Sequence, residues 1–157
     1  MTAQKHLTLS YYYSKIQNKI ITPVHLYPIP FNASFSLSTD ALWDTGASIS
    51  AITPEIKDKL KVTTIDKKTI ASVHSTQVVD IAYITVELPN NVIKKNIKVA
   101  VCNITLNIGM ILGMDIISMG DFALSNGNNQ TLISFAVPPF QDKTDYYEKA
   151  IGVNKGY

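Results

Sequence analysis

Short runs in which apolar and polar residues alternate recur along this chain, and they constrain its fold more than any other feature. Residues 7–13 and 97–101 alternate in this way, and residues 31–37 do so with four apolar side chains on one face: Phe31, Ala33, Phe35 and Leu37. Alternation with a period of two is typical of a β-strand with one buried face. The sequence therefore predicts a mostly β fold built from short strands.

Two apolar sets between residues 79 and 88 predict an irregular strand. The first set is Val79, Ile81 and Tyr83, and the second, in the opposite phase, is Ile84, Val86 and Leu88. One extra residue in the strand would produce this switch, so a β-bulge is predicted where the phase changes. Residues 122–135 predict a hairpin around Asn126-Gly127, because Asn-Gly supplies the positive φ angles that such a turn requires.

Few helices are predicted. Thr53 has the character of an N-cap and Pro54 that of a first helical residue, in a short helix that ends near Leu60. Residues 113–119 predict two further helical turns that end at Gly120. One or two short helices would therefore accompany the strands.

Composition excludes several classes of protein. The chain has 157 residues, which suits one domain, and 46% of them are apolar while 17% are charged, as in a globular protein. A net charge of +2 is too small to indicate nucleic acid or an anionic membrane as a partner. The N-terminus does not lead into a signal-peptide h-region, and no apolar window is long enough to span a bilayer. We therefore expect a soluble, cytoplasmic protein without a nucleic-acid or membrane partner.

Metal and disulfide chemistry are not predicted. His6 and His25 have no acidic or histidine partner at ligand spacing, so we expect no metal, and no motif indicates a cofactor. Cys102 is the only cysteine and cannot form an internal disulfide. It lies in an apolar run, and it can be interpreted either as a small buried hydrophobic residue or as a catalytic thiol.

The segment with the clearest chemical character is residues 41–48, which read Ala-Leu-Trp-Asp-Thr-Gly-Ala-Ser. Asp-Thr-Gly alone also occurs in ordinary turns. Here Asp44 follows three apolar residues, which carry it toward the interior, where a carboxylate is costly unless it is hydrogen-bonded or paired. Gly46 allows backbone amides to approach that carboxylate closely. The segment therefore indicates a carboxylate held for chemistry.

A second segment, residues 110–115, reads Met-Ile-Leu-Gly-Met-Asp and predicts an apolar strand that runs into a short helix. With both segments in this order, residues 31–137 resemble the retropepsin family of retroviral and retroviral-like aspartic proteases. The resemblance is closer to cellular and bacterial members than to viral ones. It implies a mostly β, retropepsin-like half-barrel with one or two short helices that functions as a homodimer.

The resemblance implies a role for each matching residue. Asp44 would be the catalytic aspartate, Thr45 would lock two active-site loops together, and Gly46 would support the loop and contact substrate. The remaining implied roles are substrate binding for Ala47 and Ser48, and support of the catalytic loop for Gly113 and Asp115.

A flap hairpin is implied between residues 69–71 and 77–79, with its tip at Val73, His74 and Ser75 in contact with substrate. Residues 71–78 contain no glycine, whereas viral flaps have glycine-rich tips. This difference leaves substrate handling open, and His74 has the alternative interpretation of an exposed turn residue.

The sequence also lacks a supporting ion pair of the viral enzymes. Those enzymes carry an acid at or just beyond the position of Ser48 and an arginine at the position of Met114. Both partners are missing here. Loss of both costs less than loss of one, because no lone charge is left behind.

A complete site would require a second carboxylate. Asp115 is not followed by the glycine turn, and Asp40 and Asp121 lie in hydrophilic turn contexts. Because only one Asp-Thr-Gly is present, the second Asp44 would come from another copy across a two-fold axis. We therefore expect a homodimeric aspartic endopeptidase that cleaves polypeptides. The alternative is a binding or assembly module with the same fold and little or no proteolytic activity.

Three parts of the chain are expected. Residues 1–30 would form an N-terminal extension with one or more strands in the dimer or an edge sheet. Residues 31–137 would form the catalytic domain. Residues 138–157, which begin with Pro138-Pro139, would form a polar tail.

Overall fold

A computed structural model of the chain describes residues 5–71 and 76–154. In this part of the chain, strands dominate and helices are short, so the predicted mostly β fold class is confirmed. The strands are β1 (Leu7–Tyr13), β2 (Ile21–Tyr27), β3 (Leu37–Trp43), β4 (Ala51–Ile52), β5 (Asp66–Ala71), β6 (Thr76–Glu87), β7 (Ile93–Val101), β8 (Met110–Leu112), β9 (Asp121–Gly127) and β10 (Gln130–Val137). The helices are α1 (Pro54–Leu60), α2 (Met114–Ile117) and α3 (Tyr146–Asn154).

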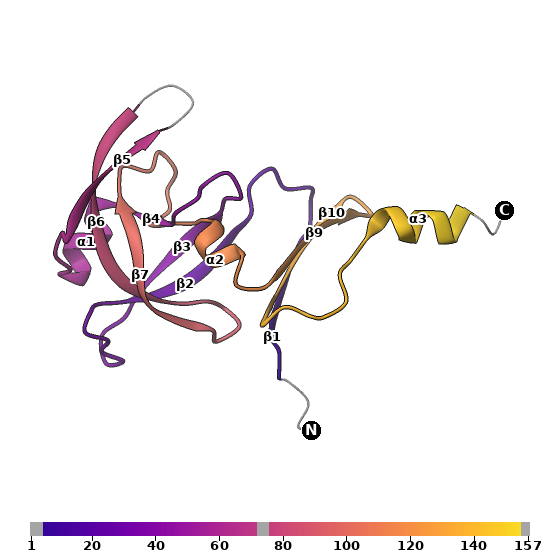
Figure 1. Ribbon diagram of the computed structural model, residues 1–157, viewed down its shortest axis with the longest axis horizontal. Coiled ribbons are helices and arrows are strands. Elements are labelled where there is room, and N and C mark those ends of the chain that lie inside the picture. The colour runs from indigo at the N-terminus through magenta and orange to yellow at the C-terminus, as the bar shows by residue number, and fades with distance from the viewer. Residues whose placement is uncertain (1–4, 72–75, 155–157) are drawn as a thin grey trace.

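The larger of two sheets closes on itself. Its strand order is β2-β3-β8-β4-β7-β6-β5, and β2 also pairs with β6 (Figure 1). The length of β6 makes this closure possible, because its first half pairs with β5 and its last residues pair with β2. Most neighbouring strands are antiparallel, but β3 runs parallel to β8 and β4 runs parallel to β7. The closed sheet, called the barrel below, surrounds the main apolar core.

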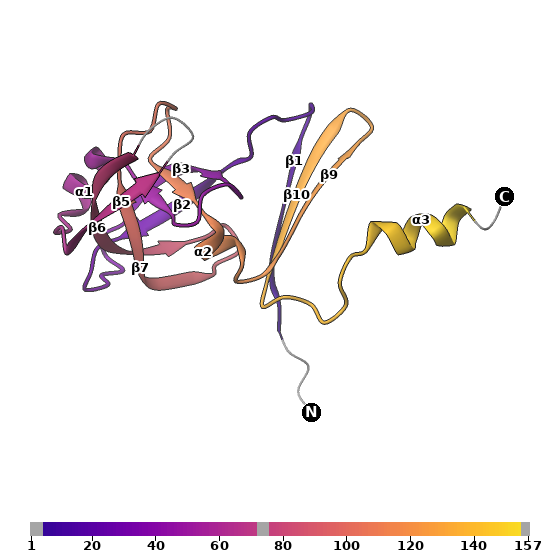
Figure 2. The same cartoon turned by 45° about the horizontal axis from the view of Figure 1, so that its top comes forward.

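A smaller sheet, in the order β1-β10-β9, lies beside the barrel (Figure 2). Aromatic contacts join the two sheets. The ring of Trp43 on β3 lies 5.4 Å from that of Phe122 and 5.0 Å from that of Phe135. Trp43 also donates its indole N–H to the Thr22 hydroxyl at 2.9 Å, so both the apolar and the polar parts of this buried side chain have partners. The two sheets therefore share one core.

One local prediction is confirmed, and a second is corrected in its position. Helix α1 begins at Pro54, and the Thr53 hydroxyl accepts a hydrogen bond from the Ile56 N–H at 3.3 Å, as an N-cap does. The β6–β7 pairing shifts register between Ile84 and Val86, close to the predicted phase change, but the extra residue lies in β7, between Lys94 and Ile97, and not in β6 as predicted. Both apolar sets of β6 are buried because the strand packs on its two faces: Val79 and Ile81 belong to a small cluster, and Ile84 and Val86 belong to the main core.

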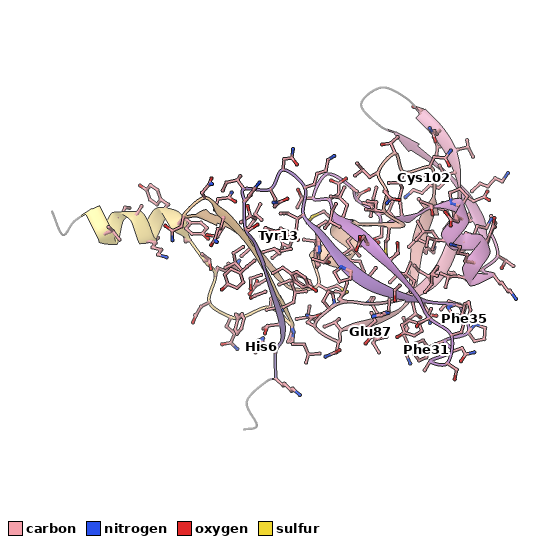
Figure 3. The ribbon with its side chains drawn as sticks, turned by 180° about the vertical axis from the view of Figure 1, so that it is seen from behind. His6, Tyr13, Phe31, Phe35, Glu87 and Cys102 are labelled. Atoms are coloured by element: carbon pink, nitrogen blue, oxygen red, sulfur yellow. The ribbon has the colours of Figure 1, made fainter. Side chains whose placement is uncertain are left out.

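The predicted strand over residues 31–37 is wrong. The chain turns there: the Phe35 N–H donates to the Asn32 carbonyl at 3.2 Å, and the Ser34 N–H donates to the Asn32 side-chain oxygen at 3.0 Å. Asn32 thus offers its own hydrogen bonds in place of a sheet ladder. Phe35 is 42% exposed, and Figure 3 shows it with Phe31 in this loop. Strand β3 begins only at Leu37.

Two other details differ from the predictions. The β9–β10 turn has its positive φ angles at Asn128 (φ 50°) and Asn129 (φ 60°), beyond the predicted Asn-Gly pair. Asparagine tolerates this conformation because its short side chain can bond locally. Helix α2 spans four residues, so it is shorter than the two turns predicted over residues 113–119.

The sequence patterns did not identify strand β2, which contains Pro23. Pro23 pairs with β3 alone, because the β2–β6 pairing starts at His25, so the missing N–H breaks no ladder on the other side. Strand β2 thus belongs to the barrel, whereas β1 belongs to the smaller sheet. The expected division at residue 31 stays a prediction.

Helix α3 extends away from both sheets (Figures 1 and 2). Its first residues, Tyr146 and Tyr147, are 60% and 72% exposed. None of the helices in residues 5–71 and 76–154 has the length and apolar character needed to cross a membrane.

Candidate active site

Two parallel strands deliver the two sequence motifs to one place. Strand β3 pairs with β8 so that Trp43 lies opposite Leu112. The pairing continues one step further, because the Asp44 N–H donates to the Leu112 carbonyl at 2.9 Å. Since parallel strands end at the same edge of a sheet, Asp44 leaves β3 beside the point where Gly113 leaves β8.

The loop after β3 holds the Asp44 side chain in place. Asp44 is half-buried, and its Oδ1 accepts a hydrogen bond from the Gly46 N–H at 2.9 Å. The Ala47 N–H returns to the Asp44 carbonyl at 3.2 Å, which closes a tight turn. A Cβ atom at residue 46 would lie 3.2 Å from the same Oδ1, so glycine is the residue that lets the amide approach freely.

Gly113 lets the second loop pack against the first. A Cβ atom at residue 113 would lie 2.8 Å from the Ile49 carbonyl carbon and 2.9 Å from the Ala47 oxygen. Both are backbone atoms with little freedom to move. The adjacent Met114 N–H donates to the same Ala47 oxygen at 2.8 Å. The two loops therefore touch backbone to backbone.

Ser50 connects these loops, and the sequence analysis missed it. Its side chain is buried, and its hydroxyl donates to Asp115 Oδ1 at 2.7 Å and accepts from the Gly113 N–H at 3.0 Å. Its own N–H donates to Asp115 Oδ2 at 3.1 Å. The available signal was a hydroxyl residue flanked by Ile49 and Ala51, since a buried polar group needs hydrogen-bond partners. Ser50, which follows the Asp44 loop, thus ties this part of the chain to the second motif through one hydroxyl.

The structure brings most of the predicted site residues together. Residues 44–48 form one loop, and Gly113 and Asp115 lie against it through the contacts above. The predicted flap residues Val73, His74 and Ser75 lie outside the described residues. The strands that lead to them, β5 and β6, pair as an antiparallel hairpin as far as Ala71 opposite Thr76.

The other two aspartates considered as the second carboxylate, Asp40 and Asp121, lie away from the Asp44 loop. Asp40 is exposed on β3. The Asp121 carboxylate accepts a hydrogen bond from the Phe140 N–H at 2.7 Å. Neither belongs to the Asp44 loop.

A small apolar cluster lies next to the loop and apart from the main core. It consists of buried Ala51, Val79, Ile81 and Ala100, with partly buried Ile49, Cys102 and Ile111 against them. Ile111 directly precedes Leu112, whose carbonyl accepts the hydrogen bond from the Asp44 N–H. The cluster therefore places apolar side chains next to the Asp44 loop.

Cys102 belongs to this cluster. Burial raises the pKa of its thiol. A raised pKa disfavours the thiolate that a nucleophile requires, so the structure favours the interpretation of Cys102 as a small hydrophobe.

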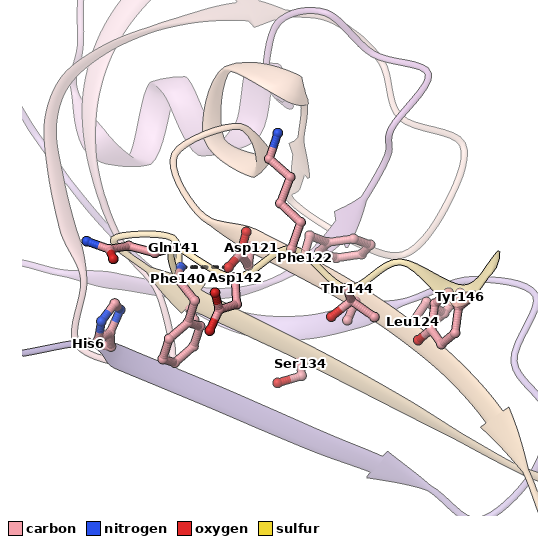
Figure 4. Close-up of a pocket in the computed structure, with 13 residues that line it drawn as sticks. His6, Asp121, Phe122, Leu124, Ser134, Phe140, Gln141, Asp142, Thr144 and Tyr146 are labelled. Carbon is pink, nitrogen blue, oxygen red and sulfur yellow. Dashed lines mark hydrogen bonds between the residues drawn. The ribbon is translucent and has the colours of Figure 1, made fainter. Parts of the chain in front are cut away.

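A cavity of about 800 Å³ lies away from Asp44 (Figure 4). It is bounded by β9, β10 and the segment that leads to α3. At one end, His6 stacks on Phe140 with ring centroids 4.1 Å apart. No residue of the Asp44 loop lines it. Its size therefore does not make it a candidate for the catalytic cleft.

Comparison with known proteins supplies independent information. A family model described as aspartyl protease matches residues 35–116, which include both loops. Among solved structures, a retropepsin-like aspartic protease from Rickettsia conorii is similar, with 18% identity, a TM-score of 0.51, and coverage of 87% of this chain and 99% of that one. The protease of simian foamy virus (mac) is 19% identical, with a TM-score of 0.38 and coverage of 62% and 92%. No curated protein sequence matches the chain.

Proposed function

The chain belongs to the aspartyl protease family and has the retropepsin-like fold, and from that premise we propose that it is an aspartic endopeptidase that works as a homodimer. Each subunit would contribute one Asp44. The observation that carries the proposal is the single Asp-Thr-Gly loop, which fixes Asp44 Oδ1 through the Gly46 N–H at 2.9 Å. Because the sequence contains no second Asp-Thr-Gly, one chain supplies half of a carboxylate pair.

Two facing Asp44 carboxylates would share one proton, because like charges within hydrogen-bond reach cannot both ionise. The ionised carboxylate takes a proton from a water molecule as its oxygen attacks the scissile carbonyl carbon. The protonated carboxylate gives its proton to the carbonyl oxygen. A proton then passes to the leaving nitrogen as the C–N bond breaks. The rate should follow a bell-shaped pH profile with its maximum on the acid side of neutrality.

The surroundings of Asp44 suit an extended polypeptide substrate. Thr45 and Gly46 are exposed, and in a dimer Thr45 would contact the loop of the other subunit. Gly46, Ala47 and Ser48 would run alongside the substrate backbone. The apolar cluster next to Ile111 would receive apolar side chains, and the β5–β6 hairpin would cover the substrate from the opposite side.

Cleavage of a denatured protein between pH 4 and 7, with and without a transition-state inhibitor of aspartic proteases, tests the proposal. Asp44→Asn should lower the rate by more than about a thousandfold, because it removes the shared proton chemistry. Asp40→Asn is a matched control, because it makes the same change at an exposed position of β3, the strand that leads to Asp44. No cleavage by the wild-type protein would support a binding or assembly module instead.

A further inference from the structure

Two lysines, Lys68 and Lys98, share one sheet face with the apolar cluster beside Asp44. In an antiparallel pair, residues directly opposite each other project from the same face. Lys68 on β5 lies opposite Val79, a member of the cluster. On β7, Ala100 of the cluster lies opposite Ile81, and Lys98, two residues earlier, lies opposite Tyr83.

These lysines line a cavity that also touches the catalytic loop. The cavity has a volume of about 440 Å³. Ser48 and Ile49, which continue the Asp44 loop, form one side, and the lysines of β5 and β7 form another. The residues that define its charge are Lys68, Lys94, Lys98 and Asp115. Segments from four parts of the chain therefore converge on one basic hollow.

The positive charge of this hollow is only partly balanced, because in the described part of the chain its three lysines face one acid, Asp115. The ion pairs observed there join Lys57 to Asp80 and Lys59 to Glu55. Asp115, the acid in the cavity, already accepts hydrogen bonds from Ser50 on both carboxylate oxygens. Three like charges gathered around one hollow repel one another, so an incoming carboxylate would be attracted.

The position of the hollow limits what can bring that carboxylate. Ser48 is four residues from Asp44, so their Cα atoms are at most about 14 Å apart. An extended peptide advances about 3.3 Å per residue, so this distance corresponds to about four substrate residues. A side chain within four residues of the scissile bond can therefore reach the hollow.

We propose that Lys68, Lys94 and Lys98 form a basic subsite that selects polypeptide substrates with a glutamate or aspartate within four residues of the cleaved bond. The proposal rests on the endopeptidase function proposed above. Ion pairs at such exposed sites contribute modestly, so two or three of them should favour Glu over Gln by about five- to tenfold in kcat/KM at low salt. High salt should weaken this preference.

The test uses a cleaved peptide in which each of the four positions on either side of the scissile bond carries Glu, Gln or Lys in turn. The wild-type protein should prefer Glu over Gln at one position on one side. Lys94→Glu/Lys98→Glu should reverse the preference there, so that the Lys peptide is cleaved fastest. Lys149→Glu on α3 makes the same kind of charge change at an exposed, distant position and should leave the preference unchanged. Equal rates for Glu and Gln at every position would overturn the subsite.

A binding measurement separates failure of the subsite from failure of the proposed function. Fluorescent peptides with Glu or Gln at the tested positions are titrated into the Asp44→Asn protein. Tighter binding of a Glu peptide, lost in Asp44→Asn/Lys94→Glu/Lys98→Glu, would support the subsite even if the wild-type protein cleaved no peptide. Equal binding would overturn the subsite, whereas absence of all cleavage would contradict only the endopeptidase function. Lys98→Gln provides a milder variant if the double charge reversal lowers the thermal stability.

Discussion

Ser50→Ala should weaken the whole protein more than its small change in volume suggests. The substitution removes the hydroxyl that donates to Asp115 Oδ1 at 2.7 Å and accepts from the Gly113 N–H at 3.0 Å. The Gly113 N–H is buried, so its loss of a partner costs about 1–3 kcal/mol. The hydrogen bond to the Asp115 carboxylate adds about 1 kcal/mol, a low value for a charged acceptor because Asp115 is exposed and water replaces part of the bond.

The combined cost is therefore about 3 kcal/mol, which corresponds to a fall in Tm of about 6–12 °C for a chain of this size. Urea unfolding at a fixed protein concentration measures it, since oligomer stability depends on concentration. Ser48→Ala is the matched control: it removes an exposed hydroxyl two residues earlier and should change stability by less than about 0.5 kcal/mol.

A double-mutant cycle with Asp115→Ala identifies the partner. If the Ser50–Asp115 contact carries the effect, the two substitutions together should cost less than the sum of the single ones, by about 1 kcal/mol. Additive costs, or a Ser50→Ala protein as stable as Ser48→Ala, would refute the assignment of Ser50 as the connection between the loops.

Three other substitutions test separate parts of the structure. Gly113→Ala should destabilise by more than about 2 kcal/mol in urea unfolding, because its Cβ would lie 2.8 Å from a backbone atom. Thr53→Ala should cost about 1 kcal/mol by the same assay, because it removes the N-cap of α1. Hydrogen bonds from Thr64 and, to a smaller extent, from Lys57 lower the pKa of Asp80. Asp80 therefore stabilises the fold at pH values above its unfolded pKa. This contribution is lost as the pH falls through the lower pKa of the folded state. Asp80→Asn should flatten that part of a stability–pH profile, and an unchanged profile would contradict the role of these contacts.

What the sequence could predict was local. The N-cap of α1 and the Asp44 loop are each specified by a few adjacent residues, so their chemistry was visible in the sequence. Residues 31–37 show the limit of that approach. Their alternation satisfies the strand pattern, but the side chain of Asn32 competes for the backbone hydrogen bonds and turns the chain.

The features that the sequence did not reveal depend on long-range pairing. Ser50 is an ordinary serine until the β3–β8 pairing brings Asp115 and Gly113 to it. The lysines of β5 and β7 are far apart in the sequence and meet only because β6 pairs with both strands. Register between distant strands is set by the whole core, and a local pattern does not contain it.

The central claim is that each active site takes one Asp44 from each of two chains, and mixed dimers test it most directly. Wild-type chains are refolded together with a threefold excess of Asp44→Asn chains, so that subunits pair at random. Only one pair in about sixteen would then contain two wild-type chains, and the activity per wild-type chain should fall to about a quarter. Activity per wild-type chain that stays at its full value would mean that one chain holds a complete site, and it would contradict the account.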